Sequence, residues 1–158
     1  MSRSWQSRLA VIAGAAVLVS AGVAFADMSL RQKEFTKKQD EYFKKEVAPT
    51  DEKCGIKLNA KIDWQSFKAE IDKHLDGKDG HNYSFYGYCS SPPSAMFSIC
   101  DSEDGKAAVK KRIKSYTCKF GGEGKRKIEL KGSSLTMWVD WKASNYDDFV
   151  KEYLGKTL

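Results

Sequence analysis

Apolar side chains recur with a helical period where the polar part of the chain begins. Around residues 29–47, Met28, Phe35 and Tyr42 lie seven residues apart, and lysines and glutamates fill most positions between them. This spacing predicts an amphipathic helix, and Pro49 is expected to end it because proline cannot continue a helix. The helix either packs on its own domain or presents its apolar stripe to a partner.

A strand and a short helix are predicted next. Residues 54–64 alternate strictly between apolar and polar side chains, which is typical of a strand with one face in water. Its polar side carries Lys57, Asn59, Lys61 and Asp63. The apolar spacing of residues 64–75 predicts a helix that begins after Asp63 and stops at Gly77.

The last third of the chain is dominated by strand-like segments. Three stretches rich in β-branched and aromatic side chains, separated by glycine-containing turns, predict strands at residues 116–120, 127–130 and 135–141. Short helical segments are expected at residues 94–100, 106–113 and 145–155. The sequence therefore predicts an α+β fold: an antiparallel sheet of about four strands with helices packed on one face, stapled by two disulfides.

The first 26 residues differ from the rest of the chain. Arg3 and Arg8 precede an uncharged stretch at residues 9–26, which ends in the small–x–small pattern of Ala24 and Ala26. This order predicts a secretory signal peptide for the general secretion route. The alternative is a retained membrane anchor, for which the uncharged stretch is at the short limit.

Cleavage of this segment divides the chain into three expected parts. They are a signal peptide at residues 1–26, an N-terminal amphipathic helix at 27–50 and a single disulfide-containing α+β domain at 51–158. The mature protein is expected in the periplasm, or secreted, without stable membrane insertion.

The four cysteines all follow the predicted signal peptide. An even number in an exported chain predicts two disulfides, and the absence of a C-x-x-C spacing argues against a zinc ribbon or a thioredoxin-like redox site. Three pairings are possible. We favour Cys89–Cys100, which closes a short loop around Pro92, together with Cys54–Cys118, which ties an early strand to a late one.

Composition excludes several classes of protein. With 41% hydrophobic and 30% charged residues, the chain is too apolar for a disordered protein and too polar for a multi-spanning membrane protein. Its net charge of +6 rests mainly on lysine, whereas nucleic-acid binders usually carry more arginine and a larger excess. We expect no nucleic-acid partner.

No motif indicates a catalytic, cofactor-binding or metal-binding residue. The chain lacks G-x-S-x-G, H-E-x-x-H and a glycine-rich nucleotide loop before a helix. His74 and His81 have no third ligand at a metal-type spacing, and the acidic turns at residues 76–80 and 101–105 lack the spacing of a calcium loop.

Two segments are candidate partner-binding sites. Residues 106–127 hold nine basic residues and one acid, and the helix and hairpin predicted there are expected to bring together Lys110, Lys111, Lys114, Lys125 and Lys127. The aromatic segment after residue 82 offers Tyr83, Tyr86 and Tyr88. The alternatives are an ordinary solvated surface for the lysines and a core-covering role for the tyrosines.

These features favour an exported, non-enzymatic binding module. Its partner is expected to be a protein or an anionic envelope polymer, and inhibition of an envelope-targeting enzyme is one form that such binding takes. The alternative function is a small envelope hydrolase whose site is assembled from carboxylates distant in sequence.

Overall fold

The computed structural model describes residues 27–78, 84–122, 124 and 126–158. The predicted signal peptide, Tyr83 and Lys125 lie outside these residues. Within them, six helices and four strands follow the order α1 (Leu30–Cys54), β1 (Asn59–Ile62), α2 (Lys68–Leu75), α3 (Phe85–Cys89), α4 (Ser91–Ile99), α5 (Glu103–Arg112), β2 (Ser115–Phe120), β3 (Lys127–Lys131), β4 (Ser134–Val139) and α6 (Tyr146–Thr157).

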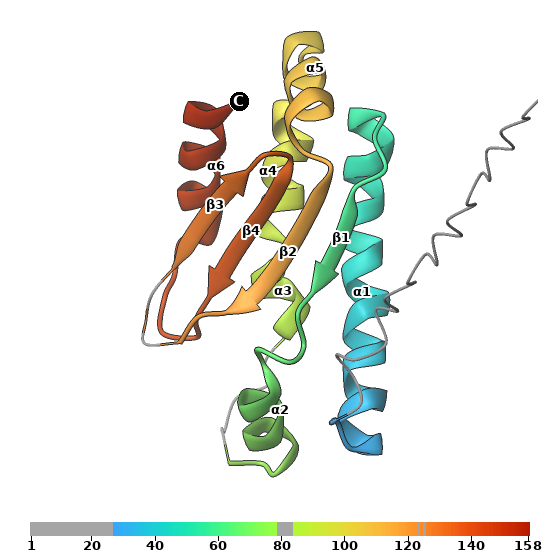
Figure 1. The fold of residues 1–158 in the computed structure, drawn as a ribbon, viewed down its shortest axis with the longest axis vertical. Coiled ribbons are helices and arrows are strands. Elements are labelled where there is room, and N and C mark those ends of the chain that lie inside the picture. The colour runs from blue at the N-terminus through green and yellow to red at the C-terminus, as the bar shows by residue number, and fades with distance from the viewer. Residues whose placement is uncertain (1–26, 79–83, 123, 125) are drawn as a thin grey trace, which may run out of the picture.

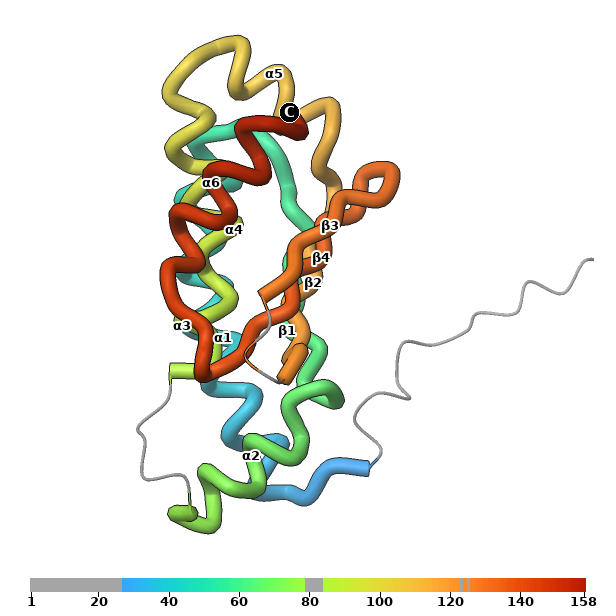
Figure 2. Tube along the Cα trace, turned by 90° about the vertical axis from the view of Figure 1, so that its left-hand side faces the viewer, coloured from blue at the N-terminus to red at the C-terminus, as the bar shows by residue number. Residues whose placement is uncertain are grey.

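The molecule has two layers (Figures 1 and 2). A single four-stranded sheet forms one layer, and α1, α3, α4 and α6 lie together against one of its faces. The α+β class, the two disulfides and the coverage of one face by helices agree with the sequence-based prediction.

The predicted antiparallel arrangement of the sheet is wrong. The strand order is β1-β2-β4-β3, with β1 parallel to β2, β2 parallel to β4, and only β3 and β4 antiparallel. The chain between β1 and β2 passes through α2, α3, α4 and α5, and such a helical crossover returns it to the end where β1 began. The later hairpin places β4 beside β2 and β3 at the edge, so the sheet is mixed and mostly parallel.

The core lies between the sheet and the helices. Side chains of β2 and β4 alternate between buried and partly exposed positions, so one face of each strand contributes to the core. The largest fully buried side chains come from both layers and include Phe43, Phe67, Phe85, Met96, Tyr116 and Leu135. The Tyr116 hydroxyl donates a hydrogen bond to the Cys89 carbonyl oxygen at 2.9 Å, and burial raises the pKa of this phenol well above its usual value.

The favoured disulfide pairing is also wrong. Cys54 is bonded to Cys100, and Cys89 to Cys118. Cys89 and Cys100 flank the nine-residue helix α4, which separates them by about 14 Å along its axis, whereas bonded cysteines need Cα atoms within about 7 Å. The observed bridges instead join α1 to the end of α4, and α3 to the middle of β2.

Helix α1 continues past Pro49, where the sequence predicted its end, and past the expected boundary at residue 50. Its last turns hold buried side chains that anchor it, because Thr50 donates a hydrogen bond to the Pro93 carbonyl oxygen at 2.9 Å and Cys54 is disulfide-bonded. Tertiary contacts therefore outweigh the loss of one helical hydrogen bond at proline. As a result, residues 54–58 are not part of the strand, and β1 has only four residues.

Other helix limits differ by a few residues from the predictions. The helix expected directly after Asp63 begins at Lys68, behind a series of turns, and α5 begins at Glu103 with Ser102 as its N-cap. None of the helices in the described ranges is both long and apolar enough to cross a membrane.

Candidate functional site

The described members of the predicted basic set do not share one face. Lys110 and Lys111 lie in the last turn of α5, and Lys114 directly precedes β2, at one end of the sheet. Lys127 begins β3 and pairs with Trp138 at the other end (Figure 1). Four residue steps along β3 separate these ends by about 13 Å. The predicted single face is therefore split, and we call Lys110, Lys111 and Lys114 the basic pole.

Two lysines of the basic pole interact with the protein itself. The Lys110 ammonium lies beside Gly55, the C-cap of α1, where the partial negative charge of a helix end attracts a cation. The Lys114 ammonium donates a hydrogen bond to the Lys110 carbonyl oxygen. Both lysines thus have local structural roles.

The described tyrosines of the aromatic segment mainly pack against the domain. Tyr88 contacts Trp141 edge-on, with ring centroids 4.8 Å apart, and Tyr146 at 6.1 Å. Tyr86 stacks on Tyr42 of α1 at 5.3 Å, and the Tyr42 side chain is half exposed. Tyr88 therefore contributes to the covering of the core, while Tyr86 lies at its margin.

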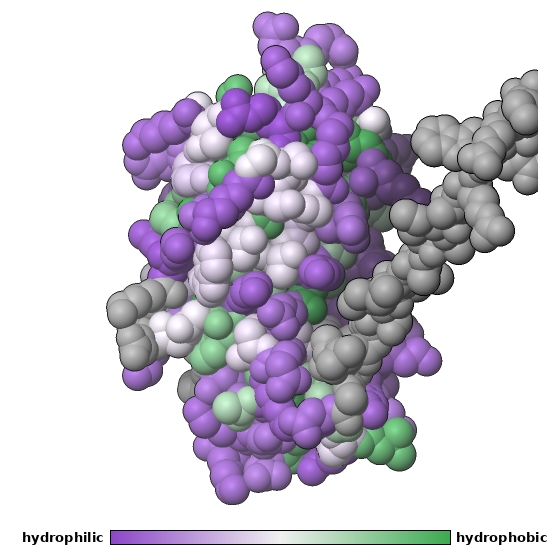
Figure 3. Space-filling model, in the orientation of Figure 1, coloured by the Kyte–Doolittle hydropathy of each residue, from purple (hydrophilic) through white to green (hydrophobic). Residues whose placement is uncertain are grey.

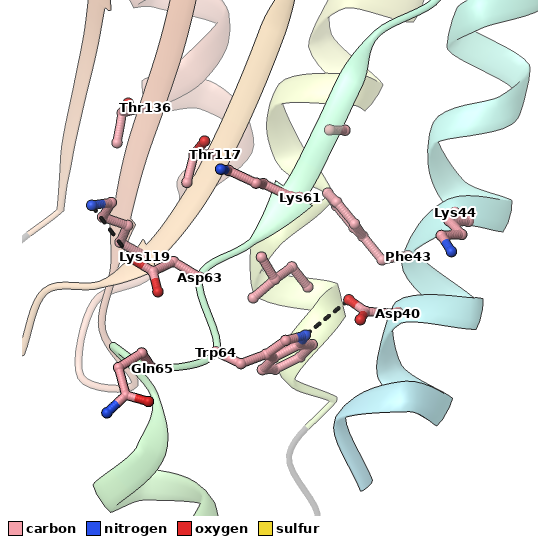
Figure 4. Close-up of a pocket in the computed structure, with 12 residues that line it drawn as sticks. Asp40, Phe43, Lys44, Lys61, Asp63, Trp64, Gln65, Thr117, Lys119 and Thr136 are labelled. Atoms are coloured by element: carbon pink, nitrogen blue, oxygen red, sulfur yellow. Dashed lines mark hydrogen bonds and ion pairs between the residues drawn. The ribbon is translucent and has the colours of Figure 1, made fainter. Parts of the chain in front are cut away.

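A groove runs along β1, and we call it the β1 groove. Its larger part has a volume of about 590 Å³, and an adjoining hollow of about 450 Å³ shares Phe43, Lys44 and Ala60 with it. The side chains of the larger part come from α1, from β1 and the turn after it, and from the neighbouring strands, and they include Asp40, Phe43, Lys44, Lys61, Asp63, Trp64, Gln65, Thr117, Lys119 and Thr136 (Figure 4). The adjoining hollow adds Val47 and Asp51 of α1 and Lys57 of the segment before β1.

The turn after β1 fixes the wall of the groove. The Ser66 hydroxyl donates to the Asp63 carbonyl oxygen at 2.6 Å and accepts from the Phe120 N–H at 2.9 Å, which ties the turn to the end of β2. This geometry buries Trp64, whose indole N–H donates to Asp40 of α1 at 2.9 Å. The contact joins α1 to the turn across the groove (Figure 4).

Each acidic side chain of the β1 groove has an internal partner. Asp40 accepts from Trp64, Asp51 accepts from the Leu58 N–H at 2.9 Å, and Asp63 lies 3.4 Å from the Lys119 ammonium. Burial raises the pKa of the Asp40 carboxyl, although the Trp64 hydrogen bond and the charge of Lys44 act in the opposite direction. The carboxylates are thus held by the fold.

Most lysines of the β1 groove form no ion pair with a described residue. Among the described residues, Lys44, Lys57 and Lys61 form no ion pair. They come from α1, from the segment before β1, and from β1 itself, so the fold gathers them along one groove. Lys57 and Lys61 are therefore available to an external anion, and Lys44, whose charge also acts on Asp40, adds a third cation to the groove.

The groove opens onto the uncovered face of the sheet, which we call the open face. It is formed by the outward side chains Asn59, Lys61, Ser115, Thr117, Lys119, Lys127, Glu129, Lys131, Ser134, Thr136 and Trp138. Figure 3 views this side of the molecule and shows a central area of near-neutral hydropathy bordered by hydrophilic side chains. Groove and open face share Lys61, Thr117, Lys119 and Thr136 and therefore form one continuous surface.

Sequence reasoning did not single out the lysines of the β1 groove as a set. The polar side of residues 54–64 already contained Lys57 and Lys61, so the alternation was a usable signal for half of the groove. Nothing in the sequence pairs these residues with Asp40 and Lys44, because that pairing depends on how α1 packs beside β1.

No cluster of three or more metal-ligating side chains occurs in the described part of the chain. Comparison of the chain with family models, with curated proteins and with solved structures finds no match.

Proposed function

We propose that this protein is an exported binding module that holds an anionic ligand in the β1 groove. The proposal rests on a difference between the acidic and the basic side chains of the groove. Its carboxylates Asp40, Asp51 and Asp63 are each bound internally, while its unpaired lysines face solvent. An anion that binds there meets cations without displacing an internal partner.

The two disulfides are consistent with an oxidising, exported location. They also support binding, because they tie α1 to α4 and α3 to β2, and α1 and β2 both contribute to the groove. A rigid wall loses little conformational entropy when a ligand binds. We propose the periplasm as the location.

The proposal is tested with two soluble polyanions, poly-L-glutamate and polygalacturonate, at low and at physiological ionic strength. The groove variant Lys44→Gln, Lys57→Gln, Lys61→Gln removes the three unpaired lysines. The control variant Lys110→Gln, Lys111→Gln, Lys114→Gln removes the same number of charges from the basic pole.

We expect wild type to bind at least one polymer, with affinity falling as salt screens the charges. Exposed charge contacts contribute up to about 1 kcal/mol each, so the groove variant is expected to lose roughly tenfold or more in affinity. The basic-pole variant is expected to bind like wild type. Loss of binding in the basic-pole variant with retention in the groove variant would assign the site to residues 110–114 and refute the groove.

A second candidate function, a small envelope hydrolase, is favoured by one feature of the same groove. Asp40 and Asp63 both line it, and their surroundings differ, since burial raises the pKa of Asp40 while Asp63 pairs with a lysine. Glycosidases use two carboxyl groups of unequal acidity, one as acid and one as base or nucleophile. Release of reducing ends from polygalacturonate by wild type, and its loss in Asp40→Asn, would replace the binding proposal by hydrolysis.

A further inference from the structure

The open face is an unusual surface for a sheet of this kind. Parallel strands are normally covered on both faces, and here three of the four strands, β1, β2 and β4, are mutually parallel. Helices cover one face, and no described element covers the other (Figures 1 and 2). The chemistry of the bare face indicates which kind of ligand it would accept.

The centre of the open face carries hydroxyl groups in register. Ser115 and Ser134 are cross-strand partners whose hydroxyls are 2.9 Å apart, and Thr117 and Thr136 form the next pair along the same two strands. These short side chains leave the face low and flat, and each hydroxyl both donates and accepts hydrogen bonds. A ligand rich in hydroxyl groups matches such a surface.

An aromatic ring stands beside the hydroxyl groups, between two cations. Trp138 is the cross-strand partner of Lys119 on one side and of Lys127 on the other, and the Lys127 ammonium lies 4.7 Å from its ring centroid. Trp138 is partly exposed although it lies on a central strand. The open face carries four lysines against two carboxylates, Asp63 at its border and Glu129. Lys119 pairs with Asp63, and Lys127 and Lys131 pair with Glu129, whereas Lys61 forms no ion pair with a described residue.

The sheet edges offer little to an added peptide strand. At β1, the Ala60 N–H donates to the Leu58 carbonyl oxygen at 2.8 Å, and the Leu58 N–H is taken by Asp51. At β3, the Leu130 N–H donates to the Tyr153 hydroxyl at 2.7 Å. A peptide that binds by strand addition needs a row of free backbone groups at an edge. The binding chemistry therefore lies in the side chains of the open face.

We propose that the open face binds an anionic polysaccharide, with Trp138 as the platform on which a sugar ring stacks. This inference rests on the proposed function and names the class of its ligand. The hydroxyls of Thr117 and Thr136 hydrogen-bond the sugar hydroxyls, and Lys61, which forms no ion pair with a described residue, pairs with an acidic group of the ligand. Two strand spacings, about 10 Å, separate Lys61 from the strand of Trp138, so a chain of several sugars reaches from the ring into the β1 groove.

The experiment compares the two polymers used above at equal carboxylate concentration. Polygalacturonate carries its carboxylates on sugar rings, whereas poly-L-glutamate carries them on a peptide, so their difference isolates recognition of the rings. Wild type is expected to bind polygalacturonate more tightly. Trp138→Leu removes the platform, and Trp138→Phe keeps a ring in its place.

An aromatic contact contributes about 0.5–1.5 kcal/mol, so Trp138→Leu is expected to lower the affinity for polygalacturonate roughly two- to tenfold and to leave poly-L-glutamate unaffected. Trp138→Phe is expected to retain most of the affinity. The variant Thr117→Val, Thr136→Val keeps branched side chains on the strands and removes both hydroxyls, and it is expected to weaken polygalacturonate binding alone. Circular dichroism and urea unfolding establish that each variant is folded.

The two proposals fail in distinguishable ways. If both polymers bind wild type equally, or if Trp138→Leu weakens both or neither, the polysaccharide assignment is overturned while the lysine groove stands. If wild type binds neither polymer, the proposed function itself fails, and the polysaccharide assignment fails with it.

Discussion

Substitution of Gly105 by alanine tests the close packing between α4 and α5. Gly105 lies in the first turn of α5, three residues after the N-cap Ser102, and its N–H donates to the Ser102 hydroxyl at 3.0 Å. A Cβ atom at this position would lie 1.9 Å from the Ile99 carbonyl oxygen and 2.9 Å from the Ser102 hydroxyl oxygen. The backbone of α4 therefore leaves no room for a methyl group.

The magnitude follows from this overlap. Carbon and carbonyl oxygen normally approach to about 3.3 Å, so the methyl group intrudes by about 1.4 Å. The obstacle is backbone next to Cys100, which is held by its disulfide to α1. Overpacking of this kind costs about 1–3 kcal/mol or more, whereas alanine in an unobstructed helix gains about 0.5–1 kcal/mol over glycine. We expect Gly105→Ala to lose at least about 1 kcal/mol of unfolding free energy.

The assay is equilibrium urea unfolding with an internal comparison. A Cβ atom added to Gly155 in α6 would meet no neighbouring atom within 4 Å, so Gly155→Ala is expected to stabilise by about 0.4–1 kcal/mol. With a urea dependence of about 1–3 kcal/mol per molar, the two variants should shift the midpoint in opposite directions by roughly half a molar. If Gly105→Ala were as stable as wild type or more so, the described approach of α5 to Ile99 would be wrong.

Two further predictions concern the disulfides and the groove. Digestion under non-reducing conditions is expected to yield peptides joined as Cys54–Cys100 and Cys89–Cys118, and recovery of a Cys89–Cys100 peptide would contradict the structure. Replacement of either pair by serine is expected to lower the free energy of unfolding by about 3–4 kcal/mol, because the unfolded chain is no longer cross-linked. Asp40→Asn is expected to raise the free energy of unfolding at neutral pH and to leave it unchanged well below pH 3.8. Burial raises the pKa of Asp40, so its ionisation destabilises the folded wild type as the pH rises above the ordinary pKa of an aspartate. An asparagine does not ionise, and its amide oxygen can still accept the Trp64 hydrogen bond. Urea unfolding at the two pH values measures this difference, and a variant less stable than wild type at neutral pH would show that ionised Asp40 stabilises the fold.

Local sequence determined the elements that neighbouring residues form by themselves. The start of α1 is an example, since Ser29 and Gln32 form a reciprocal capping box within three residues of each other. The strands of the last third formed where β-branched and aromatic side chains between glycine-containing turns predicted them, and the even number of cysteines in a chain with a predicted signal peptide indicated two disulfides. Each of these features can be read from a short stretch of the sequence or from the number of cysteines.

The direction of the strands was partly within reach of the sequence. Helical segments were predicted between β1 and β2, and a crossover of that length implies parallel strands. The insertion of β4 between β2 and β3 was not readable, because alternation shows which face of a strand is buried and does not show which strand lies beside it.

The tertiary structure alone decided the partners of Cys54, the continuation of α1 through Pro49, and the β1 groove. Cys54 lies in the last turn of a helix that is held by contacts to α4, and this position brings it to Cys100. The groove joins Asp40 and Lys44 on α1 to Lys61 on β1 and to Thr136 on β4. Periodicity shows which face of each element is buried, but it does not show which other element packs against that face. Only the packing of the whole chain decides this, and it therefore also decides which lysines have no ion-pair partner.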